Sequence, residues 1–175
     1  ITSLFLCHFI YPEDVDFRKY AMFASNAERP KSVTPIITKI PIKLEKNTRI
    51  ALIGNTLFDR MRDYGHFEAL LHQVYPNHEI VVRNLAWSAD EVDLQPRPDN
   101  FADTEQHLTA MKADVIIAAF GFNESFAGPK EIPYFEDRLE KYLTSLTSKA
   151  YNGKNATSVI LISPIANENI NLVPA

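Results

Sequence analysis

Residues 49–57 read Arg-Ile-Ala-Leu-Ile-Gly-Asn-Thr-Leu, an apolar run that ends at a glycine and leads directly into a helical pattern. A short, continuous apolar run bounded by a turn residue is typical of a strand buried on both faces. From Leu57 to Val74 the apolar residues recur at helical spacing, which predicts a helix over residues 56–75. This strand-to-helix unit starts the fold, and the chain then repeats it.

Three more apolar runs follow, at residues 79–85, 114–120 and 158–162, and helical patterns separate them at residues 101–112 and 133–148. Strands that alternate with helices and are apolar throughout indicate a parallel sheet covered on both faces. We therefore expect an α/β domain. Residues 37–44 alternate only loosely, and the proline at position 41 excludes a central strand, so an edge strand or an extended lead-in is expected there.

Length and composition fit one globular domain. The chain has 175 residues, a formal net charge of −4 and one cysteine. A mildly acidic chain without a dense basic run gives no indication of nucleic-acid binding. Cys7 cannot form an internal disulfide and is expected to be a small core or tail residue, and no Cys/His spacing is typical of a metal site. Residues 1–36 are expected to form an N-terminal extension or linker, and residues 37–175 the domain.

The two ends of the chain give further expectations. Residues 1–11 are apolar but too short to span a bilayer, and small residues at 24–27 suit signal-peptide cleavage. Charged residues at 13–19 are atypical of a signal peptide. Together these features lean toward a secreted or extracytoplasmic protein without a membrane span. Because the chain ends at Ala175, soon after the fourth strand, we expect the sheet to be incomplete at its C-terminal side.

Polar residues follow the predicted strands at the edge where an open parallel sheet binds ligands. Asn55 and Thr56 follow the first strand, Ser88 the second, and Asn123 and Glu124 the third. The Thr56 hydroxyl, at a strand-to-helix turn, could lie where developing negative charge is stabilised. Alternatively, Thr56 or Asn55 could simply cap the helix.

The other strand-end residues also have two interpretations each. The Asn123 amide could donate to an oxyanion or could satisfy loop backbone. Glu124 could orient a base or cap the following loop. Trp87, the single tryptophan, could stack on a substrate ring or plug the sheet edge. The loop at residues 86–100 is long enough to be functional in a compact domain.

Three of these segments resemble the motifs of the SGNH (GDSL-type) hydrolase family. Residues 53–57, Ile-Gly-Asn-Thr-Leu, resemble the first motif, usually Gly-Asp-Ser-Leu. Residues 84–90, Asn-Leu-Ala-Trp-Ser-Ala-Asp, resemble the second, which normally carries a glycine before its aspartate. Residues 121–124, Gly-Phe-Asn-Glu, resemble the third, usually Gly-x-Asn-Asp. The resemblance spans about residues 49–165, in the expected order.

This resemblance implies a three-layer α/β/α sandwich with a flavodoxin-like parallel sheet. It also implies hydrolysis of acyl or acetyl esters of lipids or carbohydrates, without a cofactor. Thr56 takes the nucleophile position, and the oxyanion positions fall to the N–H groups of Thr56 and Ala89 and to the amide of Asn123. The remaining motif residues are expected to contact substrate: Asn55, Trp87, Ser88 and Glu124.

The chain departs from the family pattern at four motif positions. Threonine replaces the nucleophilic serine, and its extra methyl group stiffens χ1. Asn55 replaces an aspartate, Ala89 replaces a glycine, and Glu124 replaces an aspartate. The family's Asp-x-x-His, which supplies the base, is expected beyond Ala175. The histidines at positions 8, 66, 72, 78 and 107 are not well placed to replace it, so this chain by itself is expected to have little or no esterase activity.

Two other functions remain open at this stage. A degenerate SGNH domain could bind a carbohydrate or acyl ligand without turning it over. A nucleotide- or flavin-binding module is also compatible with an α/β sheet. However, the first turn has one glycine rather than Gly-x-Gly-x-x-Gly, and no Walker lysine follows. The sequence does not indicate the substrate or the oligomeric state.

Overall fold

The structure, a computed structural model, describes residues 22–38 and 40–165. Cys7, His8 and most of the suspected signal segment therefore lie outside the described residues. The elements, in chain order, are β1 (Lys31–Ser32), β2 (Arg49–Gly54), α1 (Thr56–Met61), α2 (His66–Val74), β3 (Val81–Asn84), α3 (Thr104–Met111), β4 (Val115–Ala119), the 3-10 turns η2 (Glu124–Ala127) and η3 (Pro129–Glu131), α4 (Ile132–Thr147), β5 (Lys149–Ala150) and β6 (Ser158–Ile162).

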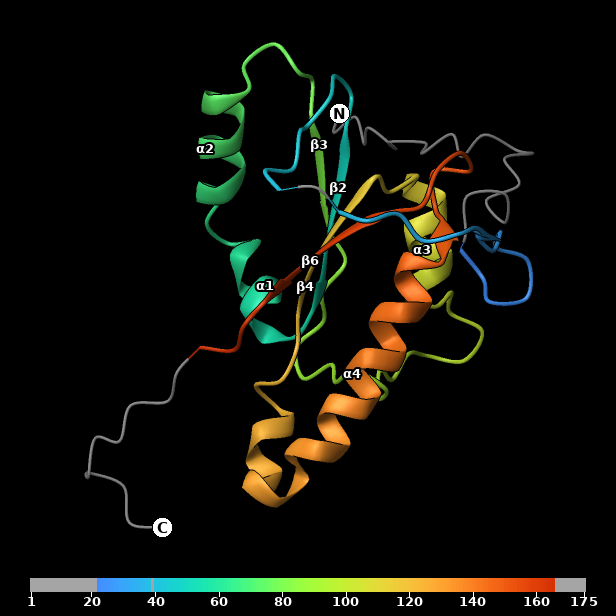
Figure 1. The fold of residues 1–175 in the computed structure, drawn as a ribbon, viewed down its shortest axis with the longest axis vertical. Coiled ribbons are helices and arrows are strands. Elements are labelled where there is room, and N and C mark those ends of the chain that lie inside the picture. The colour runs from blue at the N-terminus through green and yellow to red at the C-terminus, as the bar shows by residue number, and fades with distance from the viewer. Residues whose placement is uncertain (1–21, 39, 166–175) are drawn as a thin grey trace, which may run out of the picture.

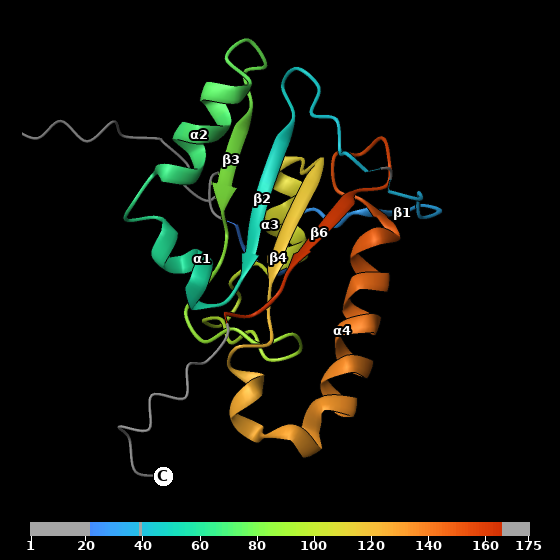
Figure 2. The same cartoon turned by 60° about the vertical axis from the view of Figure 1, so that its left-hand side comes forward.

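The main sheet has four parallel strands in the order β3-β2-β4-β6 (Figures 1 and 2). Ile50 on β2 pairs with Val82 on one side and with Val115 on the other. The same register continues outward from Val115 to Ser158 on β6. The prediction of an α/β domain with a parallel sheet is confirmed. A separate antiparallel pair, β1 and β5, was not expected.

Helices lie on both faces of this sheet, as successive residues of β2 demonstrate. Ile50 and Leu52 belong to a buried cluster with Phe58 of α1. Ala51 and Ile53 belong to another, with side chains of α3 and α4. Because adjacent side chains of a strand point to opposite faces, the central strand is apolar throughout.

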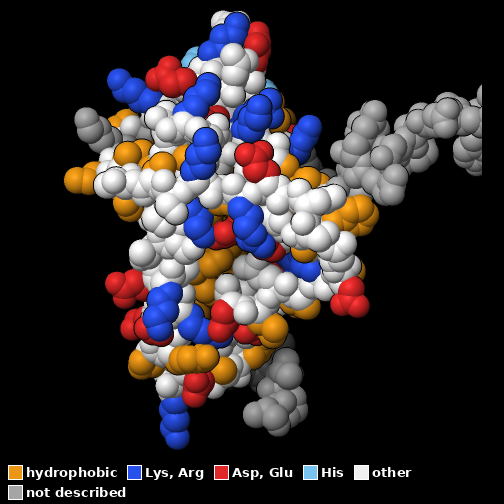
Figure 3. All heavy atoms as spheres, turned by 90° about the vertical axis from the view of Figure 1, so that its right-hand side faces the viewer, with side chains coloured by type: hydrophobic (Ala, Val, Ile, Leu, Met, Phe, Trp, Pro, Cys, Tyr) orange, Lys and Arg blue, Asp and Glu red, His pale blue; other side chains and the backbone are white. Residues whose placement is uncertain are grey.

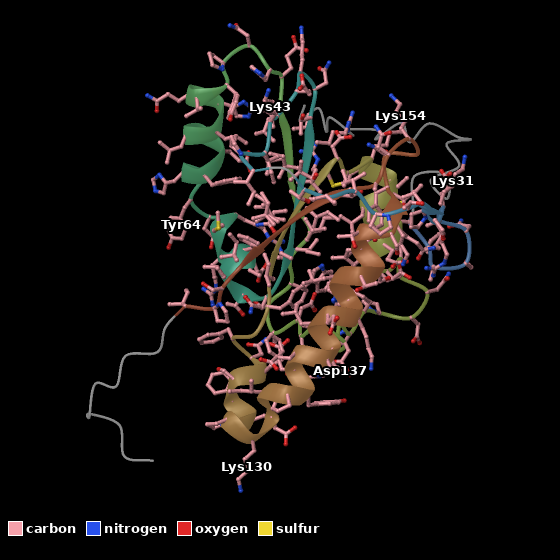
Figure 4. All side chains as sticks on the ribbon, in the orientation of Figure 1. Lys31, Lys43, Tyr64, Lys130, Asp137 and Lys154 are labelled. Carbon is pink, nitrogen blue, oxygen red and sulfur yellow. The ribbon has the colours of Figure 1, made fainter. Side chains whose placement is uncertain are left out.

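The predicted helix over residues 56–75 is wrong in one respect, because the structure has two helices there. Gly65 adopts a left-handed conformation, with φ of 39°, between α1 and α2. Tyr64 protrudes from this break and is 65% exposed (Figure 4). Leu70 and Val74, which the apolar stripe placed toward the core, are largely exposed as well.

Other differences lie at the margins of the sheet. Residues 37–44 form no strand at the positions that the structure describes, and the chain bends at residues 40–41, so the expected edge strand is absent there. Strand β6 was expected to be buried throughout, but Leu161 and Ile162 at its end are exposed because no described element covers them.

The residues just before this lead-in pack on the domain. The Gln106 amide on α3 donates to the carbonyl groups of Ala24 and Ala27, at 3.0 and 2.9 Å. An isolated bridge joins Phe23 to Phe101. The domain boundary at residue 36 stays a prediction.

The surface seen in Figure 3 mixes cationic and anionic side chains over the whole face. Hydrophobic side chains also reach the surface, among them Phe126 and Tyr134 near the start of α4. None of the helices that the structure describes is long and apolar enough to cross a membrane.

Candidate functional site

The turn after β2 is held tightly against the neighbouring strand. Gly54 has φ of 123°, and a Cβ atom at this position would lie 2.1 Å from the carbonyl oxygen of Ala119 on β4. The next residue, Asn55, donates its N–H to that same oxygen at 3.1 Å. Only glycine allows the two backbones to approach so closely. This approach fixes where Thr56 leaves the sheet.

Of the two residues expected to cap α1, Asn55 does so. Its side-chain oxygen accepts a hydrogen bond from the Leu57 N–H at 3.1 Å, and the residue is buried. The Thr56 hydroxyl is therefore not needed as a cap. It accepts a hydrogen bond from the Ala89 N–H at 3.3 Å, across the gap between the first and second motif loops.

Ala89 stands where the family pattern has glycine, and its backbone explains that preference. The residue has φ of 66°, in the left-handed region. An L-residue with a Cβ atom is strained there by about 1–2 kcal/mol. The alanine keeps the N–H that points to Thr56, at the cost of this strain.

Asn123 joins the third motif loop to the second. Its side-chain Nδ2 donates to the carbonyl oxygen of Asp90 at 3.3 Å. One of its two amide hydrogens thus serves loop backbone, which was the alternative interpretation of this residue, and the other remains available in the amide group. The structure therefore connects Thr56 to Ala89, and the adjacent Asp90 to Asn123.

A buried ion pair that the sequence did not indicate holds the second loop. The Arg97 guanidinium donates to both carboxylate oxygens of Asp90, at 2.8 and 2.6 Å. The two side chains are only 10% and 5% exposed. Arg97 also lies over the Trp87 ring, 4.6 Å from its centre. We refer to Asp90 and Arg97 as the loop clasp.

The Trp87 ring packs against two protein side chains, Arg97 and Phe101. One face of its ring meets Arg97, and Phe101 packs edge-on at 5.9 Å. Its side chain does not line the cavity described below. The residue nevertheless remains 41% exposed, so both interpretations of Trp87 stay predictions.

Glu124 and Ser88 also make specific protein contacts. The buried Glu124 carboxylate accepts hydrogen bonds from the Val92 N–H at 3.0 Å and from the Gly121 N–H at 2.9 Å. It thereby ties the loop after β3 to the loop after β4. The exposed Ser88 hydroxyl donates to the Asp59 carboxylate on α1.

A cavity of about 270 Å³ opens beside Thr56. Its wall is almost entirely apolar and includes Leu57, Ala119 and Phe122. Pro164 and its neighbours after β6 also line it. The carboxyl ends of β2, β4 and β6 thus surround this space.

No histidine is joined to the Thr56 hydroxyl by a hydrogen bond within residues 22–38 and 40–165. His107 lies on α3 against Phe101, with ring centres 5.2 Å apart. Burial and the nearby Arg97 lower the pKa of His107 below its ordinary value of 6.5. The described residues also contain no cluster of His, Cys, Asp and Glu suited to a metal ion.

Comparisons with protein-family models, with characterised proteins and with solved structures found no match. The fold and the site define an α/β domain whose polar loop residues meet at the carboxyl edge of a parallel sheet. The resemblance to SGNH hydrolases therefore depends on the motif residues and on their arrangement at this edge.

Proposed function

We propose that this chain is part of an ester hydrolase of the SGNH type, with Thr56 as its nucleophile. The observation that carries the proposal is the hydrogen bond between the Thr56 hydroxyl and the Ala89 N–H. It brings the first two motif loops together at atoms that the proposed chemistry uses. Asn123 extends the same arrangement through its bond to Asp90.

The strand order also supports the proposal. Counted along the chain within the main sheet, β3-β2-β4-β6 is the order 2-1-3-4. A flavodoxin-like sheet has the order 2-1-3-4-5, and its ligands bind beyond the carboxyl ends of the strands. Thr56, Ala89 and Asn123 all follow strands at that edge.

In the proposed reaction, Thr56 Oγ1 attacks the ester carbonyl, and its proton passes through a base to the departing alcohol. Water then hydrolyses the acyl-threonine and releases the acid. The carbonyl oxygen gains negative charge during both attacks. The Ala89 N–H, released from its bond to Thr56, and the free Asn123 amide hydrogen would donate to that oxygen.

A hydroxyl nucleophile needs a base within hydrogen-bond reach. We propose that a histidine outside residues 22–165 supplies it, because none of the described histidines bonds to Thr56.

One observation favours a second candidate, a ligand-binding domain without turnover. Ala89 carries backbone strain where the family pattern has glycine, and the nucleophile position holds a threonine. Both features would be tolerated more readily if catalysis had been lost. The adjoining cavity would then hold a ligand that is not cleaved.

Hydrolysis of p-nitrophenyl esters by the protein distinguishes the two candidates. Thr56→Val removes the hydroxyl while nearly preserving shape and should reduce kcat by at least about 100-fold, whereas Thr56→Ser should retain activity. Thr109→Val is the matched control, because that hydroxyl bonds only within α3, to the Glu105 carbonyl. Equal rates in Thr56→Val and the wild type would refute the hydrolase proposal.

A further inference from the structure

Strand β6 forms one edge of the main sheet. It pairs with β4 on one side, and none of the residues that the structure describes pairs with its other side (Figure 2). The strand reads Ser-Val-Ile-Leu-Ile over Ser158–Ile162 and contains neither a charged residue nor a proline. Edge strands commonly carry such residues, because they prevent pairing with another chain. This edge is therefore open to strand pairing.

The backbone groups that face the free edge belong to Val159 and Leu161. The Ser158 N–H donates to the carbonyl group of Asp114, which directly precedes β4, at 3.3 Å. The N–H and C=O groups of successive strand residues point to alternate sides. Those of Ser158 therefore face β4, and those of Val159 and Leu161 face away from it. Each of these two residues presents one donor and one acceptor, and Leu161 is also 44% exposed.

Helix α4, which packs against β6, has an apolar flank on the same side as the free edge. Its opposite flank faces α3, where the Ser145 hydroxyl bonds to the Glu105 carboxylate at 3.4 Å. The flank away from α3 is hollowed into a groove, and the residues that line it are Glu136, Leu139, Glu140, Leu143, Thr144 and Thr147. The free edge and this groove thus offer backbone partners and apolar surface side by side.

We propose that two copies of this chain associate through this surface, by antiparallel pairing of their β6 strands about Ile160. Val159 then lies opposite the partner's Leu161 and exchanges two hydrogen bonds with it, and the same pair recurs by symmetry. Ile160 meets the partner's Ile160 on the other face of the sheet. The two four-stranded sheets become one continuous sheet. This association does not depend on the proposed hydrolase function.

The distribution of charge favours a second copy as the occupant. Strand β6 has no charge that would repel its copy, although the chain has a net charge of −4. On the α4 flank, the acidic residues Glu136 and Glu140 lie nearer the start of the helix than Thr144 and Thr147. An antiparallel approach of two α4 helices brings the acidic part of each helix toward the threonines of the other. Like charges are thereby kept apart.

The size of the surface sets the expected affinity. Strand β6 and the α4 flank supply about eleven residues from each copy. This is about half of the 20–30 residues that each partner contributes to a standard interface. A weak dimer with a dissociation constant in the micromolar range is therefore expected.

Sedimentation velocity of the chain from about 5 to about 200 μM tests the proposal, because the fraction of dimer must rise with concentration. Leu161→Lys places a charge on the edge and should raise the dissociation constant at least about tenfold. Leu70→Lys is the matched control, since Leu70 is an exposed leucine on α2, and it should leave the constant unchanged. The mass of a single chain at all concentrations, or equal constants for Leu161→Lys and the wild type, would overturn the proposal.

Disulfide crosslinking tests the register and does not require Leu161→Lys to fold. In a Cys7→Ser background, Ile160→Cys should form a covalent dimer on oxidation with diamide. Its Cα atom would lie about 4.5 Å from that of the partner's copy, within the range of a disulfide. Leu161→Cys should remain monomeric, because residues diagonally opposite are about 7–8 Å apart or more. Equal crosslinking of the two variants would refute the pairing about Ile160.

Amide hydrogen exchange separates a second copy from other occupants of the edge. The N–H groups of Val159 and Leu161 should be protected at about 200 μM and should exchange rapidly at about 5 μM, where the dimer dissociates. Protection of both groups in a chain that stays monomeric would mean that another segment of the same chain covers the edge. That result would overturn the proposal.

Discussion

The loop clasp gives the sharpest prediction about stability. Replacing Arg97 with methionine keeps an aliphatic stem over the Trp87 ring but leaves the Asp90 carboxylate unpaired. That side chain is only 5% exposed, and its partner donated to both of its oxygens. The variant should therefore suffer the desolvation cost of a buried charge as well as the loss of two hydrogen bonds.

The expected cost of Arg97→Met is about 3–5 kcal/mol, which is the usual effect of removing one partner from a buried pair. Domains are commonly stable by only about 5–15 kcal/mol, so this is a large fraction. With an m-value near 2 kcal/mol/M, the urea midpoint should fall by roughly 1.5–2.5 M. Asp90→Asn on top of Arg97→Met should recover about 1–2 kcal/mol, because no unpaired charge then remains.

The assay is urea unfolding of the wild type, Arg97→Met, Asp90→Asn and the double variant. The Lys46–Glu79 pair, whose side chains are 62% and 65% exposed, is the control and should show no measurable coupling in the same cycle. If the effects of the two clasp substitutions simply add, the clasp does not stabilise the loop and the reasoning is refuted.

Three further predictions concern single residues. Ala89→Gly should raise the free energy of unfolding by about 0.5 kcal/mol, because the relief of left-handed strain exceeds the cost of the added entropy of the unfolded chain. The control Ala110→Gly, within α3, should lower the free energy of unfolding by about 1 kcal/mol. Equal losses of stability for the two variants in urea unfolding would contradict this. Because the pKa of His107 is lowered on folding, its contribution to stability is full above pH 6.5 and is lost as the pH falls below that value. His107→Gln should therefore make the free energy of unfolding depend less on pH between pH 7.5 and 5.5. An unchanged dependence would count against the shift. Gly54→Ala should cost at least about 3 kcal/mol in a thermal or urea melt, because its Cβ would lie 2.1 Å from the Ala119 oxygen, and a wild-type melt would show that the strands can move apart.

The strands could be predicted well from the sequence because their apolar runs are continuous and sharply bounded. The predicted fourth strand coincides with β6, and β2 differs from the predicted first strand, residues 49–53, only by including Gly54 at its end. The split between α1 and α2 could not be predicted with the same certainty, because the apolar stripe continues across Gly65. The spacing of the apolar residues does not indicate whether a glycine between them stays helical.

The sequence indicated candidate residues for a site but not their contacts. Strand-end position indicated Thr56 and Asn123, yet whether each served a cap, a loop or a substrate depended on the conformation of the loop after β3. That conformation is set by Asp90 and Arg97, seven residues apart in an irregular segment where no period links them. Gln106 is a similar case, because its acceptors lie about 80 residues earlier in the chain.

The most direct test of the central proposal is to trap the acyl group on the protein. The protein would be mixed with p-nitrophenyl octanoate, quenched in acid within milliseconds to seconds, and mapped by peptide mass spectrometry, with Thr56→Val treated in parallel. An octanoyl adduct is expected on Thr56 and none in the variant. An adduct on Ser88 or Ser163 that persists in Thr56→Val, or hydrolysis that proceeds unchanged without Thr56, would contradict it.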